Sequence, residues 1–548
     1  MPVHLAARDL AVGYPGRTVL TGVTFSAGPG DRIGLVGENG TGKTTLLRVL
    51  AGELAPTSGT RTVRGSLATV SQDLDAGPAA TVGDLVDLAL ADVRAVAARY
   101  TRALDHLSDL APDDVGHVPA ALHLAEALAS AERAAVWDAD RRADEALTRF
   151  GAPRDRGRPL STLSVGERYR ARLACVVAGR ADVLLLDEPT NHLDAEGIEY
   201  LTGRLQAWPG VVVIVTHDRR LLDDVMTAIL DLDPSVDGRP VLYGESSYAA
   251  YRFQRTAALR RWRARYAAER QRAEALAARL DDAYEGLSDE WRPPKGSQTH
   301  RRATRARIHV KAADRLIRRL EAEAVEVPVP PPSLVFPDLP ALPAGDPGGH
   351  PLLEVRGAQV PGRLDLPGVR VDLPPCGRLL VTGPNGSGKS TLLAVLAGEV
   401  GPTRGLRRQA VGVRISLLGQ DDGPGARAAD GRTGFEVYAA HALDLLTAGR
   451  LDPERLVPVA ALGLLGEADL DRPLRELSVG QRRRFDLACA LLAAPHVLLL
   501  DEPTNHLSVA LVDELTAALA TTSAAVVVAT HDRALRADLA GWPELALG

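Results

Sequence analysis

Two parts of this 548-residue chain carry the same short motifs at the same spacing, and this repeat restricts the fold more than any other feature. The signature serines Ser164 and Ser478 are each followed, after 24 residues, by a glutamate, Glu188 or Glu502. A histidine stands a further 29 residues along in both halves. Identical spacing of this kind indicates that one type of domain is present twice.

Each half also contains a phosphate-loop motif. Residues 37–44 read GENGTGKT and residues 383–390 read GPNGSGKS, which match GxxxxGK[ST] after a predicted strand and before a predicted helix. Glycines let backbone N–H groups surround a phosphate, and the helix N-terminus adds a positive dipole. We therefore predict that Lys43 bridges the β and γ oxygens of a nucleotide and that Thr44 offers its hydroxyl to Mg²⁺.

Residues 252–319, between the halves, form a strongly basic segment. They hold 19 Lys and Arg against 8 Asp and Glu, a net of +11 in a chain whose formal charge is −6. Apolar residues recur every three to four residues on both sides of a break at 288–299 that contains Pro and Gly, which predicts an antiparallel helical hairpin. Concentrated arginine favours a polyanionic partner. A solvated helix face is the alternative.

Composition excludes several classes of protein. No charge-free apolar run has the length of a membrane span, and the N-terminal MPVHLAARD lacks the pattern of a secretory signal. The three cysteines, Cys175, Cys376 and Cys489, have neither metal-binding spacing nor an evident disulfide logic. We expect a cytoplasmic protein without a membrane domain.

The whole set of motifs resembles the ATP-binding cassette ATPases. It includes the phosphate loop, a glutamine (Gln72 or Gln420), the LSxGE/Q signature, an apolar strand ending in Asp-Glu and a later His. The chain resembles the F subfamily in three features: two cassettes without membrane spans, the run DEPTNHL in both cassettes and a charged helical connector. The resemblance implies an α/β fold, with two P-loop ATP-binding cassette domains joined by an α-helical hairpin linker.

We place the first cassette at 1–244, the basic hairpin at 245–326, a Pro-rich connector at 327–350 and the second cassette at 351–548. The glutamine and the signature serine lie 92 residues apart in the first half and 58 in the second. The extra 34 residues are Ala- and Leu-rich and are predicted to be helical. They are either a subdomain that contacts the partner or a simple helical elaboration.

The resemblance also implies roles for individual residues. Glu188 and Glu502 would activate the attacking water, and His217 and His531 would contact the γ-phosphate. Mg²⁺ would be held by Thr44, Gln72, Asp187, Ser390, Gln420 and Asp501. ATP would contact Tyr14, Gly37, Glu38, Asn39, Gly40, Thr41, Gly42, Lys43, Thr44 and Thr45 in the first half, Gly383, Pro384, Asn385, Gly386, Ser387, Gly388, Lys389, Ser390 and Thr391 in the second, and the signature residues Ser164, Gly166, Glu167, Ser478, Gly480 and Gln481.

In the family arrangement each signature serves the ATP of the other cassette, so we expect a monomer whose two cassettes pair with each other. Lys43 would share its ATP with Ser478, and Lys389 with Ser164. The two sites also differ. Tyr14 is positioned to stack on adenine, whereas residues 355–366 of the second half hold no aromatic residue. We therefore expect two unequal sites. In both signatures, Val stands where Gly is common.

Members of the F subfamily bind the ribosome, and their connector reaches the P-site and the peptidyl-transferase region. The resemblance thus implies contact with ribosomal RNA and P-site tRNA, for which we single out Trp291, Lys295, Arg301, Arg302, Arg305 and Arg307. The alternative for Trp291 is packing across the hairpin. Protection of ribosomes from an antibiotic is the leading hypothesis. A housekeeping translation factor, the ATP-hydrolysing subunit of an antibiotic exporter and a DNA-repair ATPase are the rivals.

Overall fold

The computed structural model describes residues 4–14, 17–38, 40–70, 80–191, 193–233, 235–244, 247–290, 327–342, 349–384, 386–419, 431–451, 456–505 and 507–547. The chain forms two compact units. One comprises residues 1–233, 240–248 and 332–548 and holds both cassettes, and the other comprises residues 234–239 and 249–331.

The first cassette is built on a six-stranded sheet whose strand order is β5-β6-β7-β3-β8-β9. All neighbouring pairs are parallel except β8 and β9. Every residue of β6 and β7 is buried, which explains their unbroken Val and Leu runs, because helices cover both faces of such sheets. The strands are β3 (Arg32–Val36), β5 (Leu67–Val70), β6 (Val183–Asp187), β7 (Val211–Val215), β8 (Ala228–Asp231) and β9 (Val241–Tyr243).

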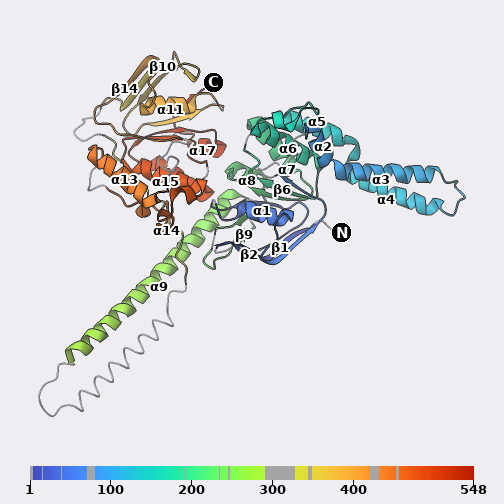
Figure 1. Ribbon diagram of the computed structural model, residues 1–548, viewed down its shortest axis with the longest axis horizontal. Coiled ribbons are helices and arrows are strands. Elements are labelled where there is room, and N and C mark those ends of the chain that lie inside the picture. Colours follow the sequence, from blue (N-terminus) through green and yellow to red (C-terminus); the bar gives the residue numbers. More distant parts are fainter. Residues whose placement is uncertain are drawn as a thin grey trace, which may run out of the picture. The chain divides into compact units, whose positions relative to one another are not determined.

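The helices of this cassette are α1 (Lys43–Ala51), α2 (Val82–Ala89), α3 (Ala91–Ser108), α4 (His117–Ala134), α5 (Ala139–Arg149), α6 (Val165–Gly179), α7 (Ala195–Gln206) and α8 (Arg219–Val225), with short 3-10 turns at Val136–Asp138 and Leu160–Thr162. Figure 1 shows α3 and α4 lying side by side and extending away from the sheet. The extra residues of the first half are therefore helical, as predicted.

A small antiparallel sheet, ordered β2-β1-β4, completes the first cassette. It consists of β1 (His4–Tyr14), β2 (Arg17–Ala27) and β4 (Ser58–Arg64). One face of β1 buries Leu5, Ala7 and Leu10 in the same core as α1 and β3, whereas Arg8 is exposed. This alternation is typical of an antiparallel sheet with one buried face.

The second cassette repeats the plan with a parallel sheet ordered β15-β16-β17-β13-β18. Its strands are β10 (Leu353–Val360), β11 (Leu364–Asp365), β12 (Arg370–Leu373), β13 (Arg378–Thr382), β14 (Arg404–Gln409), β15 (Ile415–Leu418), β16 (Val497–Asp501), β17 (Ala525–Ala529) and β18 (Glu544–Ala546). Strand β10 pairs antiparallel with β11, β12 and β14. The helices are α11 (Lys389–Ala397), α13 (Gly434–Thr447), α14 (Glu467–Leu470), α15 (Val479–Leu492), α16 (Val509–Thr521) and α17 (Arg533–Asp538), with 3-10 turns at Val459–Leu462 and Leu474–Glu476.

The second unit contains most of α9 (Tyr248–Glu290), a helix of 43 residues. It ends inside the predicted break. Trp262 is buried, and its indole Nε1 donates to the carbonyl of Pro328 at 2.8 Å, so the chain passes beside α9 again at Pro328. The predicted second arm of the hairpin lies outside the described residues. Among the helices that the structure describes, none combines the length and apolar character needed to cross a membrane.

Candidate functional site

The described residues of the two phosphate loops have similar backbone conformations. Each follows the C-terminal end of a parallel strand, β3 or β13, and leads into the first turn of α1 or α11. The residues before these helices, Gly42 and Gly388, have φ of 94° and 93° and supply no side-chain cap. A Cβ on Gly388 would stand 2.7 Å from the Arg363 carbonyl oxygen, so only glycine fits there. The uncapped N–H groups of the first helical turn are thus available to a phosphate.

Both loop lysines are buried and bond to their own loops. Lys43 Nζ donates to the carbonyls of Gly37 at 2.8 Å and Glu38 at 3.1 Å. Lys389 Nζ donates to the carbonyls of Gly383 and Pro384 at the same two distances. Burial lowers the pKa of Lys43, while nearby carboxylates, Glu188 first, oppose that shift. Each ammonium is therefore held by two carbonyls of its own phosphate loop.

The strand ends beside the loops bring together groups that suit Mg²⁺. Thr44 Oγ1 donates to Asp187 Oδ2 at 2.8 Å, and Ser390 makes the corresponding hydrogen bond to Asp501. Among the residues that the structure describes, the other oxygen of Asp501, Oδ1, is buried and has no hydrogen-bond partner. Burial raises the pKa of both aspartates. A hydroxyl and a carboxylate oxygen beside a phosphate loop are the oxygen ligands that Mg²⁺ prefers, so these residues fit that ion.

The glutamates after these aspartates adopt an uncommon backbone conformation. Glu188 has φ of 48° and Glu502 has φ of 46°, in the left-handed region that non-glycine residues seldom occupy. Their amides continue the sheet, because Glu188 N donates to Val215 O at 2.8 Å and Glu502 N donates to Ala529 O at 2.9 Å. The strain of the turn is of the kind that occurs at functional sites.

A histidine contacts each glutamate, but through a different ring nitrogen. His217 Nε2 lies 3.2 Å from Glu188 Oε1, whereas His531 Nδ1 lies 2.7 Å from Glu502 Oε1. The backbone N–H of each histidine also points at the other oxygen of its glutamate, at 3.3 Å in both sites. In the second site Thr530 Oγ1 adds a bond to Glu502 Oε2 at 3.0 Å.

Electrostatics at the first glutamate favour the protonated form. Burial raises the pKa of Glu188 to about 8, despite the opposing charge of Lys43. In the second site the hydrogen bond to Glu502 raises the pKa of His531. A carboxyl group whose pKa lies near the working pH is suited to accept a proton from water.

The signature sequences are helix caps. Ser164 Oγ accepts from Glu167 N at 3.2 Å, and Ser164 N donates back to Glu167 Oε2 at 2.9 Å. Ser478 and Gln481 repeat this capping box at the start of α15. The S-x-G-E/Q pattern therefore has a structural reason, which we did not predict although S/T-x-x-E/Q is a recognisable capping signal. Val165, in place of the usual Gly, is exposed just after the cap.

One pair of supporting residues was not predicted. Five residues after the signature serine, the first cassette has Tyr169 and the second has Arg483, both buried. Tyr169 Oη donates to the carbonyls of Asp187 at 3.2 Å and Glu188 at 3.3 Å. The Arg483 guanidinium donates to the equivalent carbonyls of Asp501 at 2.6 Å and Glu502 at 3.2 Å. A neutral phenol supports one site and a buried cation supports the other.

Within the unit that contains both cassettes, several side chains join them. Arg484 of α15 forms an ion pair of 2.7 Å with Glu38 of the first phosphate loop. Arg219 of α8 contacts Asp513 at 2.7 Å and Asp538 at 2.8 Å, and Tyr248 Oη donates to Asp513. The helix that follows the second signature thus contacts the first phosphate loop.

Some of the other predicted site residues are described by the structure and some are not. Tyr14 ends β1 and is about half exposed, so its ring is accessible. Several others lie outside the described residues: Asn39, Gln72, Asn385, Gln420, Trp291, Lys295, Arg301, Arg302, Arg305 and Arg307. Their roles stay predictions.

Comparisons with known proteins agree with this geometry. The family model described as ABC transporter matches residues 20–191 and 366–505. The tylosin resistance ATP-binding protein TlrC of Streptomyces fradiae is 38% identical over 98% of this chain and 96% of its own length. The energy-dependent translational throttle protein EttA of Mycobacterium tuberculosis is 31% identical over 94% of this chain and 86% of its own length.

Solved structures show the same two-cassette fold. RNase-L Inhibitor has a TM-score of 0.52 at 18% identity and matches 96% of this chain and 85% of its own. A complex of an archaeal ribosomal stalk protein with an archaeal ribosome recycling factor gives 0.53 at 17% identity, with the same coverage. At this identity the likeness supports the fold alone. The full-length relatives and the two matched cassettes together show that this chain is an ATPase of the ATP-binding cassette family, and that it belongs to the F subfamily.

Proposed function

We propose that this ATPase binds the ribosome and uses ATP binding and hydrolysis to protect it from an antibiotic. The observation that carries the proposal is the 38% identity, over nearly the whole of both chains, to a protein named for tylosin resistance. The basic segment at residues 252–319, with 19 basic against 8 acidic residues, supports a partner rich in phosphate.

At each site the chain's own residues account for hydrolysis. Backbone N–H groups of the loop and the lysine hold the β- and γ-phosphates, and Glu188 or Glu502 accepts a proton as water attacks the γ-phosphorus and ADP leaves. His217 or His531, held against the glutamate, donates towards the γ-phosphate. Mg²⁺, coordinated by Thr44 with Asp187 or by Ser390 with Asp501, would neutralise phosphate charge.

ATP would also hold the cassettes together. A nucleotide that contacts both Lys43 and Ser478 binds the closed arrangement better than the open one, so it shifts the population towards closure, and hydrolysis reverses that shift. The Arg484–Glu38 ion pair supports this pairing at the first site.

The test is a cell-free translation reaction inhibited by tylosin, to which the purified chain and ATP are added. We expect translation to recover, and recovery in a membrane-free extract rules out export as its cause. Tylosin stands in for the unidentified drug, so a panel of antibiotics that act at the peptidyl-transferase region is tested in parallel. Recovery with none of them would contradict the proposal.

A translation factor is the second candidate, because EttA of Mycobacterium tuberculosis also matches over 94% of this chain. The same extract separates the two. Without drug, a translation factor alters the rate of protein synthesis according to whether ATP or ADP predominates. A protection protein changes protein synthesis mainly when the drug is present.

The basic hairpin has its own test. Replacing Arg301, Arg302, Arg305 and Arg307 by Gln should weaken ribosome binding and reduce its salt dependence, while ATP hydrolysis without ribosomes is kept. Trp291→Ala should keep binding and hydrolysis but lose the relief of drug inhibition. Unchanged binding and salt dependence in the Arg variant would remove the hairpin from the proposal.

A further inference from the structure

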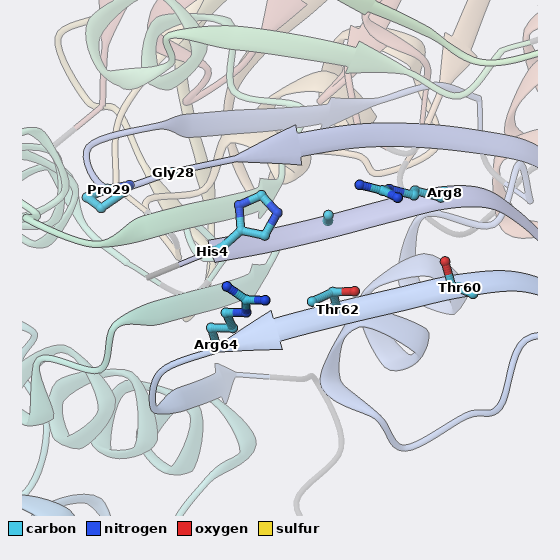
Figure 2. Close-up of a pocket in the computed structure, with 8 residues that line it drawn as sticks. His4, Arg8, Gly28, Pro29, Thr60, Thr62 and Arg64 are labelled. Atoms are coloured by element: carbon cyan, nitrogen blue, oxygen red, sulfur yellow. The ribbon is translucent and has the colours of Figure 1, made fainter. Parts of the chain in front are cut away.

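The outer face of the antiparallel sheet in the first cassette carries a hollow of about 520 Å³. Figure 2 shows its lining side chains on β1 and β4. They include His4, Arg8 and Arg64, the hydroxyls of Thr60 and Thr62, and Ala6. All the polar side chains in this set can donate hydrogen bonds, and no carboxylate lines the hollow in the part of the chain that the structure describes. We call these six residues the β1–β4 face.

Strand register explains why these residues gather. In the antiparallel pair His4 stands opposite Arg64, Ala6 opposite Thr62 and Arg8 opposite Thr60. Alternate residues of a strand share one face, so all six point to the same side. Arg8, Thr60, Thr62 and Arg64 are exposed or partly exposed, while the small Ala6 is buried between its neighbours and forms the floor of the hollow.

The charge of this face is not balanced among the described residues. There, neither Arg8 nor Arg64 has an ion-pair or side-chain hydrogen-bond partner. The carboxylate of Asp31, near one end, is engaged by the backbone N–H of Gly28 at 2.7 Å. The chain as a whole carries −6, so the charge of this face is opposite in sign to the net charge of the chain.

The second cassette offers a matched comparison. Its β10 aligns with β1 so that Glu354 occupies the position of Ala6 and Arg356 that of Arg8; the next residues, Asp9 and Gly357, both have positive φ. There Glu354 forms an ion pair with Arg356, and Arg370 forms one with Asp372. The same surface therefore carries two ion pairs in the second cassette, where Arg408 also stands opposite Glu354, whereas no ion pair is described for Arg8 or Arg64 in the first.

We propose that the β1–β4 face is a docking site for the phosphate backbone of RNA. The row of donors runs over residues 4–8 of β1 and 60–64 of β4, roughly 13 Å at about 3.3 Å per residue, and it is open on its outer side. Such a surface suits an extended series of phosphates better than one small anion. Arginine and hydroxyl side chains are the usual partners of nucleic-acid phosphates. Ribosomal RNA as the source rests on the proposed function.

The experiment uses the full-length protein and a 20-base-pair RNA duplex of arbitrary sequence, with binding followed by fluorescence anisotropy at several salt concentrations. Two variants alter the face: Ala6→Glu, which copies the second cassette, and Arg8→Gln with Arg64→Gln. Each should weaken duplex binding roughly fivefold or more at low salt and make the log–log salt slope shallower by about 1 to 2. The basic hairpin is unchanged in every protein and contributes equally.

The matched control is Arg356→Gln with Arg370→Gln, which removes two arginines that are already paired in the second cassette. It should alter the slope less than the double variant of the face. In the Ala6→Glu protein, thermal unfolding and ribosome-free ATP hydrolysis should not change, because the second cassette accommodates Glu354 at the equivalent position.

The proposal would be overturned if the salt slope of duplex binding were unchanged in both variants of the face. It would also be overturned if the control lost as much duplex affinity as those variants. Lost binding to 70S ribosomes with unchanged duplex binding would also overturn it, and would indicate an acidic protein partner. The proposed function fails separately, if the wild-type chain gives no relief of drug-inhibited translation. Duplex binding through the face does not depend on that result.

Discussion

The two ATP sites have nearly the same geometry and differ in what supports it. Both lysines contact loop carbonyls at 2.8 and 3.1 Å, and the two glutamates have φ of 48° and 46°. Behind the first site lies the neutral Tyr169, and behind the second the cation Arg483. The histidines face their glutamates through different nitrogens. The two halves thus keep the lysines and glutamates in the same geometry, while the charges around them differ.

The largest expected effect comes from removing both bases. Replacing Glu188 and Glu502 together by Gln should reduce ATP turnover by at least about 10²-fold, because a general base contributes about 10²- to 10⁴-fold, while nucleotide binding is kept. Phosphate release and nucleotide retention measure the two quantities. The single variants separate the two sites, since the turnover left in each reports one site. Near-normal turnover in the double variant would remove these glutamates from the mechanism.

Tyr14→Ala tests whether the sites bind adenine differently. The exposed ring at the end of β1 has no aromatic counterpart in residues 355–366. Loss of stacking should weaken ATP at the Lys43 site by about 1 to 3 kcal/mol, as for bases stacked on aromatic side chains elsewhere. Nucleotide titration in proteins with one functional site would show it. If the two sites bind ATP with equal affinity and the substitution changes neither affinity, the predicted difference between the sites is wrong.

The pH dependence of ATP hydrolysis can also be compared between the two sites. Burial raises the pKa of Glu188 to about 8, so below that pH the carboxyl is mostly protonated and cannot accept a proton. In a Glu502→Gln background, kcat/KM for ATP should therefore rise about tenfold between about pH 7 and pH 9, with a midpoint near 8. The pH profile of the Glu188→Gln protein is the comparison. A first-site profile that is flat over this range would show that Glu188 is already ionised.

The smallest effect concerns the residues behind the strands. Arg483→Tyr copies the first site and retains a donor for both carbonyls, but it removes a positive charge near Asp501 and Glu502. Second-site turnover at neutral pH, measured in a Glu188→Gln background, should fall about threefold, or roughly 0.6 kcal/mol. Tyr169→Phe, which removes a hydroxyl and no charge, is the control at the other site. A larger effect of the control would assign the difference to hydrogen bonding.

Much of the arrangement of the candidate site was predictable because its motifs are local. The phosphate loops, the Asp-Glu strand ends and the histidines follow from short runs, and the structure brings Thr44 beside Asp187 and each His beside its Glu. The features that escaped prediction depend on distant pairings. Tyr169 reaches carbonyls 18 and 19 residues away, and Arg8 acquires its neighbours only through the register of β1 and β4.

The left-handed backbone at Glu188 and Glu502 was also not predictable from the sequence. A non-glycine residue with positive φ carries no compositional signal, and here the sheet amide and the histidine contacts hold it in place. The basic residues of the β1–β4 face look like ordinary strand residues in the sequence, because only the paired strand shows that no carboxylate stands beside them in the described structure.

The proposed function requires the ATP-bound form of this protein to bind ribosomes. Co-sedimentation of the Glu188→Gln and Glu502→Gln double variant with 70S ribosomes tests it most directly, because this variant should hold ATP without hydrolysing it. We expect the protein to pellet with ribosomes in ATP, to remain in the supernatant in ADP and to dissociate as salt rises. A protein that stays in the supernatant with ATP at low salt would contradict the account.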